Sequence, residues 1–277
     1  MIEFDVSHYS NINPDRYEKE KRRLQIELLK LQKWVITKKK SIAIIFEGRD
    51  TAGKTGSISV LSRYLIPSNF RLVKLGIPTK NESKNWLKRY EKTLPKKGEI
   101  VFYDRSWYTR ALVEITLGYC SKAQYAAFMK NVVNWEKNLN SKNTKIIKLY
   151  LSINKDIQQD RLKKRITSPL VHWKVSETDM KMIKEWDSFT FYKNEVFNRT
   201  SHKKSPWIII NSNIKMVAIL NAFRYILEQF DYTNKKIPKP KAWSQGLRNY
   251  ELKVNNVPFK NLTLEQYNAL KGLADAN

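Results

Sequence analysis

Five stretches of the chain are apolar in the manner of buried β-strands. These stretches are Ser41–Glu47, Phe70–Leu75, Glu99–Tyr103, Lys145–Leu151 and Trp207–Ile210. The first of them, SIAIIFE, is apolar at nearly every position and shows no alternation with polar residues. Such a run is typical of a central strand of a parallel sheet, because a strand of this kind is covered on both faces.

Amphipathic patterns of helical period lie before and between these strands. The predicted helices are Asp15–Lys38, Lys54–Leu65, Ser83–Thr93, Ser106–Asn140 with a break near Gly118, Lys155–Arg165, Glu177–Thr200 and Lys215–Phe230. In the first, leucines and a valine recur at helical spacing among charged residues. Strands that alternate with helices indicate right-handed βαβ units. The sequence therefore predicts an α/β fold, a five-stranded parallel sheet with helices on both faces.

The chain divides into three parts. Residues 1–40 form an N-terminal segment with an amphipathic helix that packs on the core, and residues 41–230 contain no Gly/Ser or Pro tract that would mark a linker. Residues 231–277 change character: NKKIPKPKAWSQG is rich in proline and lysine, and LTLEQYNALKGL predicts one last short helix. We interpret this part as a basic C-terminal extension that wraps the domain or contacts a partner subunit.

The charge balance adds a constraint on partners. The chain has 52 Lys+Arg against 26 Asp+Glu, a net charge of +26. Such a field attracts polyanions, among them nucleic acid, anionic lipid and inorganic polyanions, although a Lys-rich solvated surface would give the same count. The single cysteine, Cys120, excludes an intramolecular disulfide and a cysteine-based zinc site. No signal-peptide core and no membrane-length apolar run is present, so we expect a cytoplasmic protein without a membrane partner.

The stretch IAIIFEGRDTAGKTGSI joins the first strand to the next helix and contains a phosphate-binding loop. Gly48, Gly53, Lys54 and Thr55 match the G-x-x-x-x-G-K-[ST] motif without a mismatch. Glycines allow successive backbone N–H groups to point at a phosphate, and the helix N-terminus adds its dipole. The lysine supplies a point charge and the threonine can reach Mg²⁺. An acid inside the loop, Asp50, is not required by the motif.

Two further groups of residues suit phosphate chemistry. In GEIVFYDRSWYTRALVE a strand ends in Asp104, where P-loop folds place a second metal-coordinating acid, and Arg105 and Arg110 could clamp phosphoryl oxygens. In DRLKKRITSPLVHWKVSETD six basic residues surround a helix-breaking proline, a position that carries a mobile lid in nucleotide kinases. The alternatives are an ordinary acid at a strand end and a solvated basic loop.

These blocks together resemble the type-2 polyphosphate kinases. FEGRDTAGKTGSI, PTKNESKNWLKRY, LPKKGEIVFYDRSWYTRALVE, SPLVHWKVSETD and SPWIIINSN occur here in the order and spacing of that family, over residues of about 15 to 230. The resemblance implies a P-loop kinase fold, a three-layer sandwich similar to thymidylate kinase, with a helical lid at residues of about 160–180. It also implies phosphoryl transfer between nucleotides and inorganic polyphosphate with Mg²⁺, for which Mn²⁺ is a possible substitute, and a homo-oligomer of two or four copies.

The resemblance assigns roles by position. Asp50 and Asp104 match the essential acids that organise the metal and the transferring phosphate, and with Lys54 and Arg105 they form the expected catalytic set. The expected phosphate- and nucleotide-binding residues are Gly48, Ala52, Gly53, Lys54, Thr55, Gly56, Arg105, Arg110, Arg161, Arg165 and Lys174. Three positions depart from the family pattern: Thr55 replaces a more frequent Gly or Ser, Val171-His172 replaces Lys-Arg, and Asn213-Ile214 replaces Asp-Lys. The departures weaken the expectations for the lid and for the nucleotide side.

The chemistry gives Asp50 a purpose. When the acceptor is a nucleoside diphosphate, the attacking oxygen is already ionised and no general base is needed. The obstacle is repulsion between two polyanions, so cations and metal ions must screen them. An acid beside the phosphates would be repulsive by itself, and we therefore predict that Asp50 holds Mg²⁺ opposite Asp104.

Two other functions are compatible with parts of the sequence. A nucleoside or nucleoside-monophosphate kinase with ATP as donor shares the P-loop, lid and Mg²⁺, but has no need of +26. A nucleic-acid-binding P-loop NTPase would use the charge, and tryptophans could stack on bases. However, the chain contains no recognised RNA- or DNA-binding motif, which makes nucleic acid the less favoured partner.

Overall fold

The computed structural model describes residues 2–4, 12–237, 250–254, 257–262 and 270–271. The five predicted strands are present as β2 (Ser41–Gly48), β3 (Phe70–Val73), β4 (Glu99–Asp104), β5 (Thr144–Ser152) and β6 (Trp207–Asn211). A short strand that the sequence pattern did not indicate, β1 (Ile2–Phe4), extends the sheet beside β6. The order is β1-β6-β5-β2-β4-β3 and all pairings are parallel.

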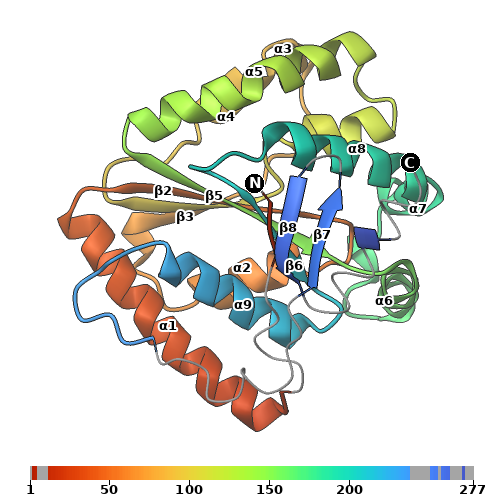
Figure 1. Cartoon of the computed structure of the whole chain (residues 1–277). Coiled ribbons are helices and arrows are strands. Elements are labelled where there is room, and N and C mark those ends of the chain that lie inside the picture. Colours follow the sequence, from red (N-terminus) through yellow and green to blue (C-terminus); the bar gives the residue numbers. More distant parts are fainter. Residues whose placement is uncertain (1, 5–11, 238–249, 255–256, 263–269, 272–277) are drawn as a thin grey trace.

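Helices cover both faces of this sheet (Figure 1). One face carries α1 (Pro14–Thr37), α2 (Lys54–Ser62) and α9 (Lys215–Glu228); the other carries α4 (Trp86–Glu91), α5 (Lys122–Ser141) and α8 (Trp186–Thr200). Successive residues of β2 alternate between the two cores, so that Ile42, Ile44 and Phe46 face α1, whereas Ala43 and Ile45 face the other layer. The continuous apolar run of β2 is thereby explained, and the predicted α/β sandwich is confirmed.

Three predicted helices are divided in the structure. In place of the predicted helix 83–93 the structure has α3 (Lys80–Lys84), which begins three residues earlier, and α4, with a break at Asn85. Residues 177–200 contain α7 (Glu177–Lys184) and α8, with a break at Glu185. The predicted break near Gly118 is present between the π-helical turn Arg110–Glu114 and α5. Further short turns are Pro67–Asn69 and His172–Lys174, and α6 spans Lys155–Thr167.

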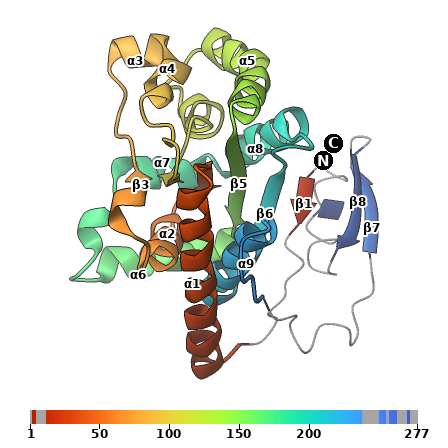
Figure 2. The same cartoon turned by 90° about the vertical axis from the view of Figure 1, so that its left-hand side faces the viewer.

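The C-terminal extension begins against α1. Glu27 on that helix is buried and accepts hydrogen bonds from the hydroxyl of Tyr232 and the backbone N–H of Lys236. Farther along, β7 (Tyr250–Val254) and β8 (Val257–Leu262) form an antiparallel hairpin, which the sequence pattern did not indicate. Figure 2 shows the hairpin beside β1, at the β6 side of the sheet. Most of the predicted last helix lies outside the described residues.

A charged pair is buried within the α5 side of the core. The ammonium of Lys148 on β5 lies 2.8 Å from the carboxylate of Glu136 on α5, and neither side chain is exposed to solvent. Lys148 also donates to the Thr200 carbonyl and the Tyr108 hydroxyl, and Glu136 accepts from the Trp107 indole. The network fixes α5 on the sheet, and each polar group in it has a partner.

Among the described residues, no helix is long and apolar enough to cross a membrane.

Candidate active site

The phosphate loop joins the C-terminal end of β2 to the N-terminus of α2. Gly53 has φ +102° and Thr51 has φ +64°, so the backbone passes through the left-handed region twice within three residues. The ammonium of Lys54 lies inside the loop and donates to the carbonyls of Gly48 (2.7 Å) and Arg49 (2.9 Å). Burial lowers the pKa of Lys54, and the charge of Asp50 opposes this shift. The loop has the shape and the charge that a bound phosphate requires.

Gly48 is required by space as well as by conformation. Its φ is +143°, and a Cβ placed on it would lie 2.5 Å from the backbone carbonyl oxygen of Leu151 on β5. We expect Gly48→Ala to lower the free energy of unfolding by about 1–3 kcal/mol, because the strand or the loop must shift. Gly56, by contrast, has nothing within 4 Å of its Cβ position and lies inside α2. Gly56→Ala should therefore raise the free energy of unfolding by about 0.5–1 kcal/mol. Urea unfolding would measure both variants, and equal stabilities of Gly48→Ala and Gly56→Ala would contradict the steric role of Gly48.

Asp104 ends β4, which pairs with β2, and its carboxylate is buried at the mouth of the loop. The hydroxyl of Thr55 donates to Asp104 Oδ2 at 2.5 Å, and the ammonium of Lys74 lies 4.0 Å from the same oxygen. The parallel register explains this contact, since it places the C-terminal end of β4 beside the end of β2. The acid at the end of β4 and the hydroxyl of the P-loop therefore lie in direct contact.

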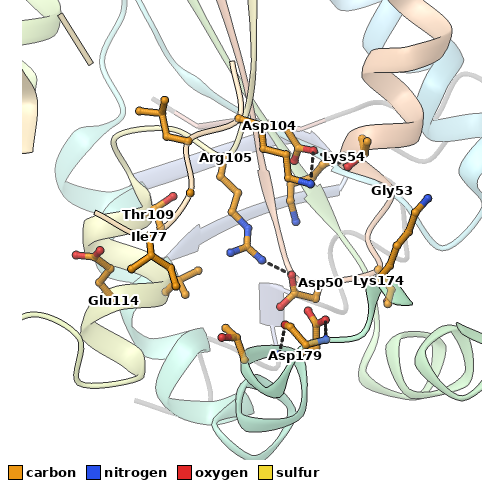
Figure 3. A pocket seen from close by; sticks show the side chains of 18 of the residues that line it. Asp50, Gly53, Lys54, Ile77, Asp104, Arg105, Thr109, Glu114, Lys174 and Asp179 are labelled. Carbon is orange, nitrogen blue, oxygen red and sulfur yellow. Dashed lines mark hydrogen bonds and ion pairs between the residues drawn. The ribbon is translucent and has the colours of Figure 1, made fainter. Parts of the chain in front are cut away.

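Asp50 lies beside the guanidinium group of Arg105 (Figure 3). The guanidinium of Arg105 donates to Asp50 Oδ1 at 2.5 Å, and the Arg105 backbone has φ +68°, a strained value for a residue other than glycine. Burial alone would raise the pKa of Asp50, but the charges of Arg105 and Lys54 lower it on balance. Asp179, from α7, lies beside Asp50, and burial together with the negative charge of Asp50 raises its pKa.

An additional buried acid, Glu47, helps to position Arg105. Glu47 is the last residue of β2 before Gly48 and accepts hydrogen bonds from both the backbone N–H and the hydroxyl of Ser106, each at 2.7 Å. Burial raises the pKa of Glu47 to about 7, against the opposing effects of Ser106, Lys54 and Arg105. The two hydrogen bonds fix the turn that follows Asp104 and thereby orient Arg105.

A cavity of about 1510 Å³ opens above these groups. The predicted site residues that line it are Asp50, Gly53, Lys54, Thr55, Gly56, Asp104, Arg105, Arg161, Arg165 and Lys174. They come from the P-loop, the end of β4, α6 and the segment after α6. Because this volume exceeds the 300–1,000 Å³ typical of a pocket for one small molecule, it has room for two phosphate-bearing groups.

Three predicted binding residues lie elsewhere. Gly48 and Ala52 belong to the phosphate loop but are not among the described residues that line the cavity. Arg110 is buried and donates to the carbonyl and hydroxyl of Ser83, while its guanidinium lies 2.9 Å from the carboxylate of Glu114 and over the ring of Trp86. In this conformation the guanidinium of Arg110 is already bonded to Ser83 and Glu114. Since these two residues line the cavity, Arg110 stabilises the cavity wall.

The basic side chains predicted to belong to a lid are bonded to different extents. Arg161 donates to three backbone carbonyls, those of Thr51, Ser212 and Asn213, so its guanidinium is engaged in joining α6 to the loop. Arg165 lies 4.0 Å from Asp179, and Lys174 has the Trp173 ring as its neighbour. Arg165 and Lys174 therefore have more capacity to bind an incoming phosphate than Arg161 does.

The donor groups at the loop suit a small, hard cation. Carboxylate and hydroxyl oxygens are preferred by Mg²⁺, and the Thr55–Asp104 pair offers both within hydrogen-bonding distance of each other. Among the described residues no group of three or more His, Cys, Asp or Glu side chains is arranged to hold a metal. Magnesium ordinarily binds one or two protein carboxylates and completes its shell with phosphate oxygens and water. The residues present fit such a shared site.

Sequence patterns did not single out Glu47, Arg49 or Asp179. A signal existed for Glu47, because it is the one acid in an otherwise apolar central strand. Arg49 carries no such signal, because its partners on α8 lie more than a hundred residues away. The sequence shows Asp179 only as the capping-box partner of Ser176, and its neighbour Asp50 is likewise remote.

Comparison with known proteins identifies the family. A sequence profile of polyphosphate kinase 2 (PPK2) matches residues 11–238. The chain belongs to the polyphosphate kinase 2 family. It is 43% identical over 220 residues to the GDP-polyphosphate phosphotransferase of Mycolicibacterium smegmatis, covering 79% of this chain and 78% of that protein. It is 40% identical over 248 residues to polyphosphate kinase PPK2B of Corynebacterium glutamicum, covering 87% and 81%.

The fold agrees with a solved structure of this polyphosphate kinase 2 family. Polyphosphate kinase 2 from Arthrobacter aurescens TC1 superposes with a TM-score of 0.75 at 26% sequence identity, over 83% of this chain and 85% of that one. Residues 11–238, which the family profile matches, include the P-loop, the end of β4 and the predicted lid. The β7–β8 hairpin lies beyond them.

Proposed function

We propose that this protein is a polyphosphate kinase that transfers a phosphoryl group reversibly between inorganic polyphosphate and a nucleoside diphosphate, with Mg²⁺ as cofactor. ADP or GDP would give ATP or GTP, and the reverse reaction would lengthen polyphosphate. The observation that carries the proposal is the cavity over the P-loop, which combines cationic side chains with the buried carboxylate of Asp104 and its bonded Thr55 hydroxyl and is large enough for two polyanions. Relatives named as GDP-polyphosphate phosphotransferases support the substrate class.

The residues divide the chemical task among them. Lys54 and the loop N–H groups bind one phosphate, and Arg105, bonded to Asp50 of the loop, neutralises charge on the transferring group. Asp104 and Asp50 would hold Mg²⁺, with the Thr55 hydroxyl beside Asp104 as a further oxygen ligand. When bound, the ion neutralises phosphoryl oxygens and fixes their orientation. No side chain is required as a general base, because the attacking phosphate oxygen is already ionised. Catalysis is therefore positioning and charge neutralisation.

The deciding experiment uses ADP, Mg²⁺ and long-chain polyphosphate, with no other phosphate donor, and follows ATP. ATP formation that stops with EDTA would support the reaction and its metal dependence together. Failure to form ATP, together with phosphorylation of a nucleoside or nucleoside monophosphate by added ATP, would overturn the proposed donor and favour a nucleotide kinase instead. Assembly into two or four copies is a prediction from the resemblance, which light scattering after gel filtration would measure.

The charge of the protein gives a second prediction. Polyphosphate carries about one charge per phosphate, so a basic groove should bind it much as proteins bind the nucleic-acid backbone. We expect the affinity for long polyphosphate to fall steeply with salt, by about 10³-fold or more between 50 and 200 mM if six or more phosphates are contacted. Titrations at four salt concentrations would measure the slope, and a flat response would contradict a basic channel. Competition by DNA at equal phosphate concentration would favour the nucleic-acid alternative.

A further inference from the structure

Three consecutive residues of the phosphate loop are bonded to the helices that flank the lid. The lid is defined here as residues 168–184, between α6 and α8. At its C-terminal side, the buried guanidinium of Arg49 donates to the carbonyl of Trp186 (3.0 Å) and the hydroxyl of Thr190 (2.5 Å), both near the N-terminus of α8. The same guanidinium lies over two rings, 3.5 Å from the centroid of Trp186 and 4.5 Å from that of Phe189.

The N-terminal side of the lid is attached to the next two loop residues. The side-chain amide of Gln158 on α6 donates to the backbone carbonyl of Asp50 at 3.1 Å. Arg161, one turn farther along α6, donates to the carbonyl of Thr51 at 3.2 Å. Thr51 holds the left-handed backbone conformation, which for a residue with a β-branched side chain persists only when surrounding contacts impose it. The helices on the two sides of the lid, α6 and α8, are therefore both bonded to residues 49–51.

The hinges of the lid lie between these attachments in the sequence. At the C-terminal side α7 ends and Glu185 leaves the helical conformation (φ −90°, ψ 32°) one residue before Trp186. At the N-terminal side α6 ends and Ser168 is extended (φ −81°, ψ 122°) directly before Pro169. Figures 1 and 2 both show α6 and α7 side by side. The segment between the hinges carries Lys174 and Asp179 to the cavity.

Two hydrogen bonds through Arg49 connect Lys54 to α8, the helix that follows the lid. Lys54, the phosphate-binding ammonium, donates to the Arg49 carbonyl, and the Arg49 side chain binds α8. We propose that Arg49 is a positioning residue that couples the lid to the phosphate loop, so that phosphate in the loop and an ordered lid stabilise each other. Linkage makes such a coupling reciprocal. The inference rests on the proposed function only in that the loop binds phosphate; it does not depend on which nucleotide reacts.

The alternative is that Arg49 only packs α8 against the core. Hydrogen exchange of the full-length protein separates the two, with inorganic tripolyphosphate as probe. In the wild type, tripolyphosphate should slow exchange both at residues 49–56 and at residues 168–184. Arg49→Lys keeps the charge but loses the planar fork that binds two acceptors and stacks on Trp186. The slowing at the loop should persist in this variant, while that at the lid should fall by about tenfold, within the range typical of allosteric coupling.

Lys155→Met is the matched control. The exposed Lys155 places its ammonium 5.9 Å from the centroid of the same Trp186 ring but has no bond to the loop, so this variant should behave as the wild type. Thr190→Val is the milder second variant, because it removes one acceptor of Arg49 and leaves the ring stack. It should reduce lid protection in the same direction by a smaller factor, which keeps the test decisive if Arg49→Lys folds poorly.

Turnover provides the independent readout. We expect Arg49→Lys to lower kcat by about 10–100-fold, as loss of a supporting contact behind an active-site group typically does, with the KM for nucleotide changed less than threefold. Wild-type lid protection in Arg49→Lys and Thr190→Val would overturn the coupling, and so would equal losses at loop and lid. Absence of tripolyphosphate protection at the loop of the wild type would overturn the phosphate site, and the coupling with it. A phosphate-protected lid in a protein that makes no ATP from polyphosphate would refute the proposed reaction alone.

Discussion

Asp104→Asn should reduce polyphosphate-dependent ATP formation by roughly 10³-fold, the equivalent of about 4 kcal/mol of lost transition-state stabilisation. The substitution keeps the size of the side chain, and its amide oxygen can still accept the hydrogen bond from Thr55. What it removes is the negative charge that would hold Mg²⁺. The melting temperature should therefore change little while kcat collapses. Initial rates over a range of Mg²⁺ concentrations, together with thermal unfolding, would measure both.

Asp50→Asn should also be inactive, for a related reason. Arg105 would lose its carboxylate partner, and the charge pattern around the transferring group would change. Asp231→Asn is the control, since Asp231 is fully exposed and lies 3.9 Å from Lys235, far along the sequence from the loop. Turnover of Asp104→Asn within threefold of the wild type would refute its role, whereas a large loss in the Asp231 control would show that the assay reports general damage.

Lys148→Met should destabilise the fold by about 3–5 kcal/mol, because it leaves the carboxylate of Glu136 buried without its cation. Urea unfolding would show a lower midpoint with an unchanged slope. Adding Glu136→Gln to Lys148→Met should recover part of the loss, since Gln can still accept from the Trp107 indole and carries no charge. A loss below 1 kcal/mol for the single variant, or strictly additive losses in the double variant, would contradict the coupling.

The same pair predicts a pH dependence. Burial by itself would raise the pKa of Glu136, but the charge of Lys148 and the hydrogen bonds from His202, Lys148 and Trp107 lower it on balance. A carboxyl whose pKa is lower in the folded state contributes stability that is present above its unfolded value, about 4.3, and is lost as the pH falls through the folded value. The stability difference between the wild type and Lys148→Met should therefore shrink below about pH 4. A difference that stayed constant down to pH 3 would count against this explanation.

The central sheet and the phosphate loop could be predicted because their signals are local. The run SIAIIFE fixes a buried strand, the glycines and Lys54 follow it directly, and Asp104 ends the next strand of the same kind. Parallel pairing then brings these ends together without further information. β1 was missed because three residues carry too little pattern, and its partner β6 lies two hundred positions away.

Side-chain engagement was the part that sequence could not supply. Arg110 and Arg161 have the composition of phosphate-binding residues, yet their guanidinium groups are bound to Ser83 and Glu114 in one case and to backbone carbonyls in the other. Whether an arginine is free depends on acceptors brought to it by the tertiary fold. The bond between Asp50 and Arg105 is of the same kind, since the motif alone does not say which cation faces the acid inside the loop.

The attachment of α6 and α8 to residues 49–51 also limits how the enzyme can be re-engineered. A lid exchanged at its two hinges, residues 168 and 185, would keep Gln158, Arg161 and Trp186 with their native loop. Such an exchange should leave the conformation of the phosphate loop intact. An exchange with boundaries farther out, within α6 and α8, would pair foreign helices with this loop. Chimeras designed to alter substrate preference should accordingly be cut at the hinges, or should transplant residues 49–51 together with both helices.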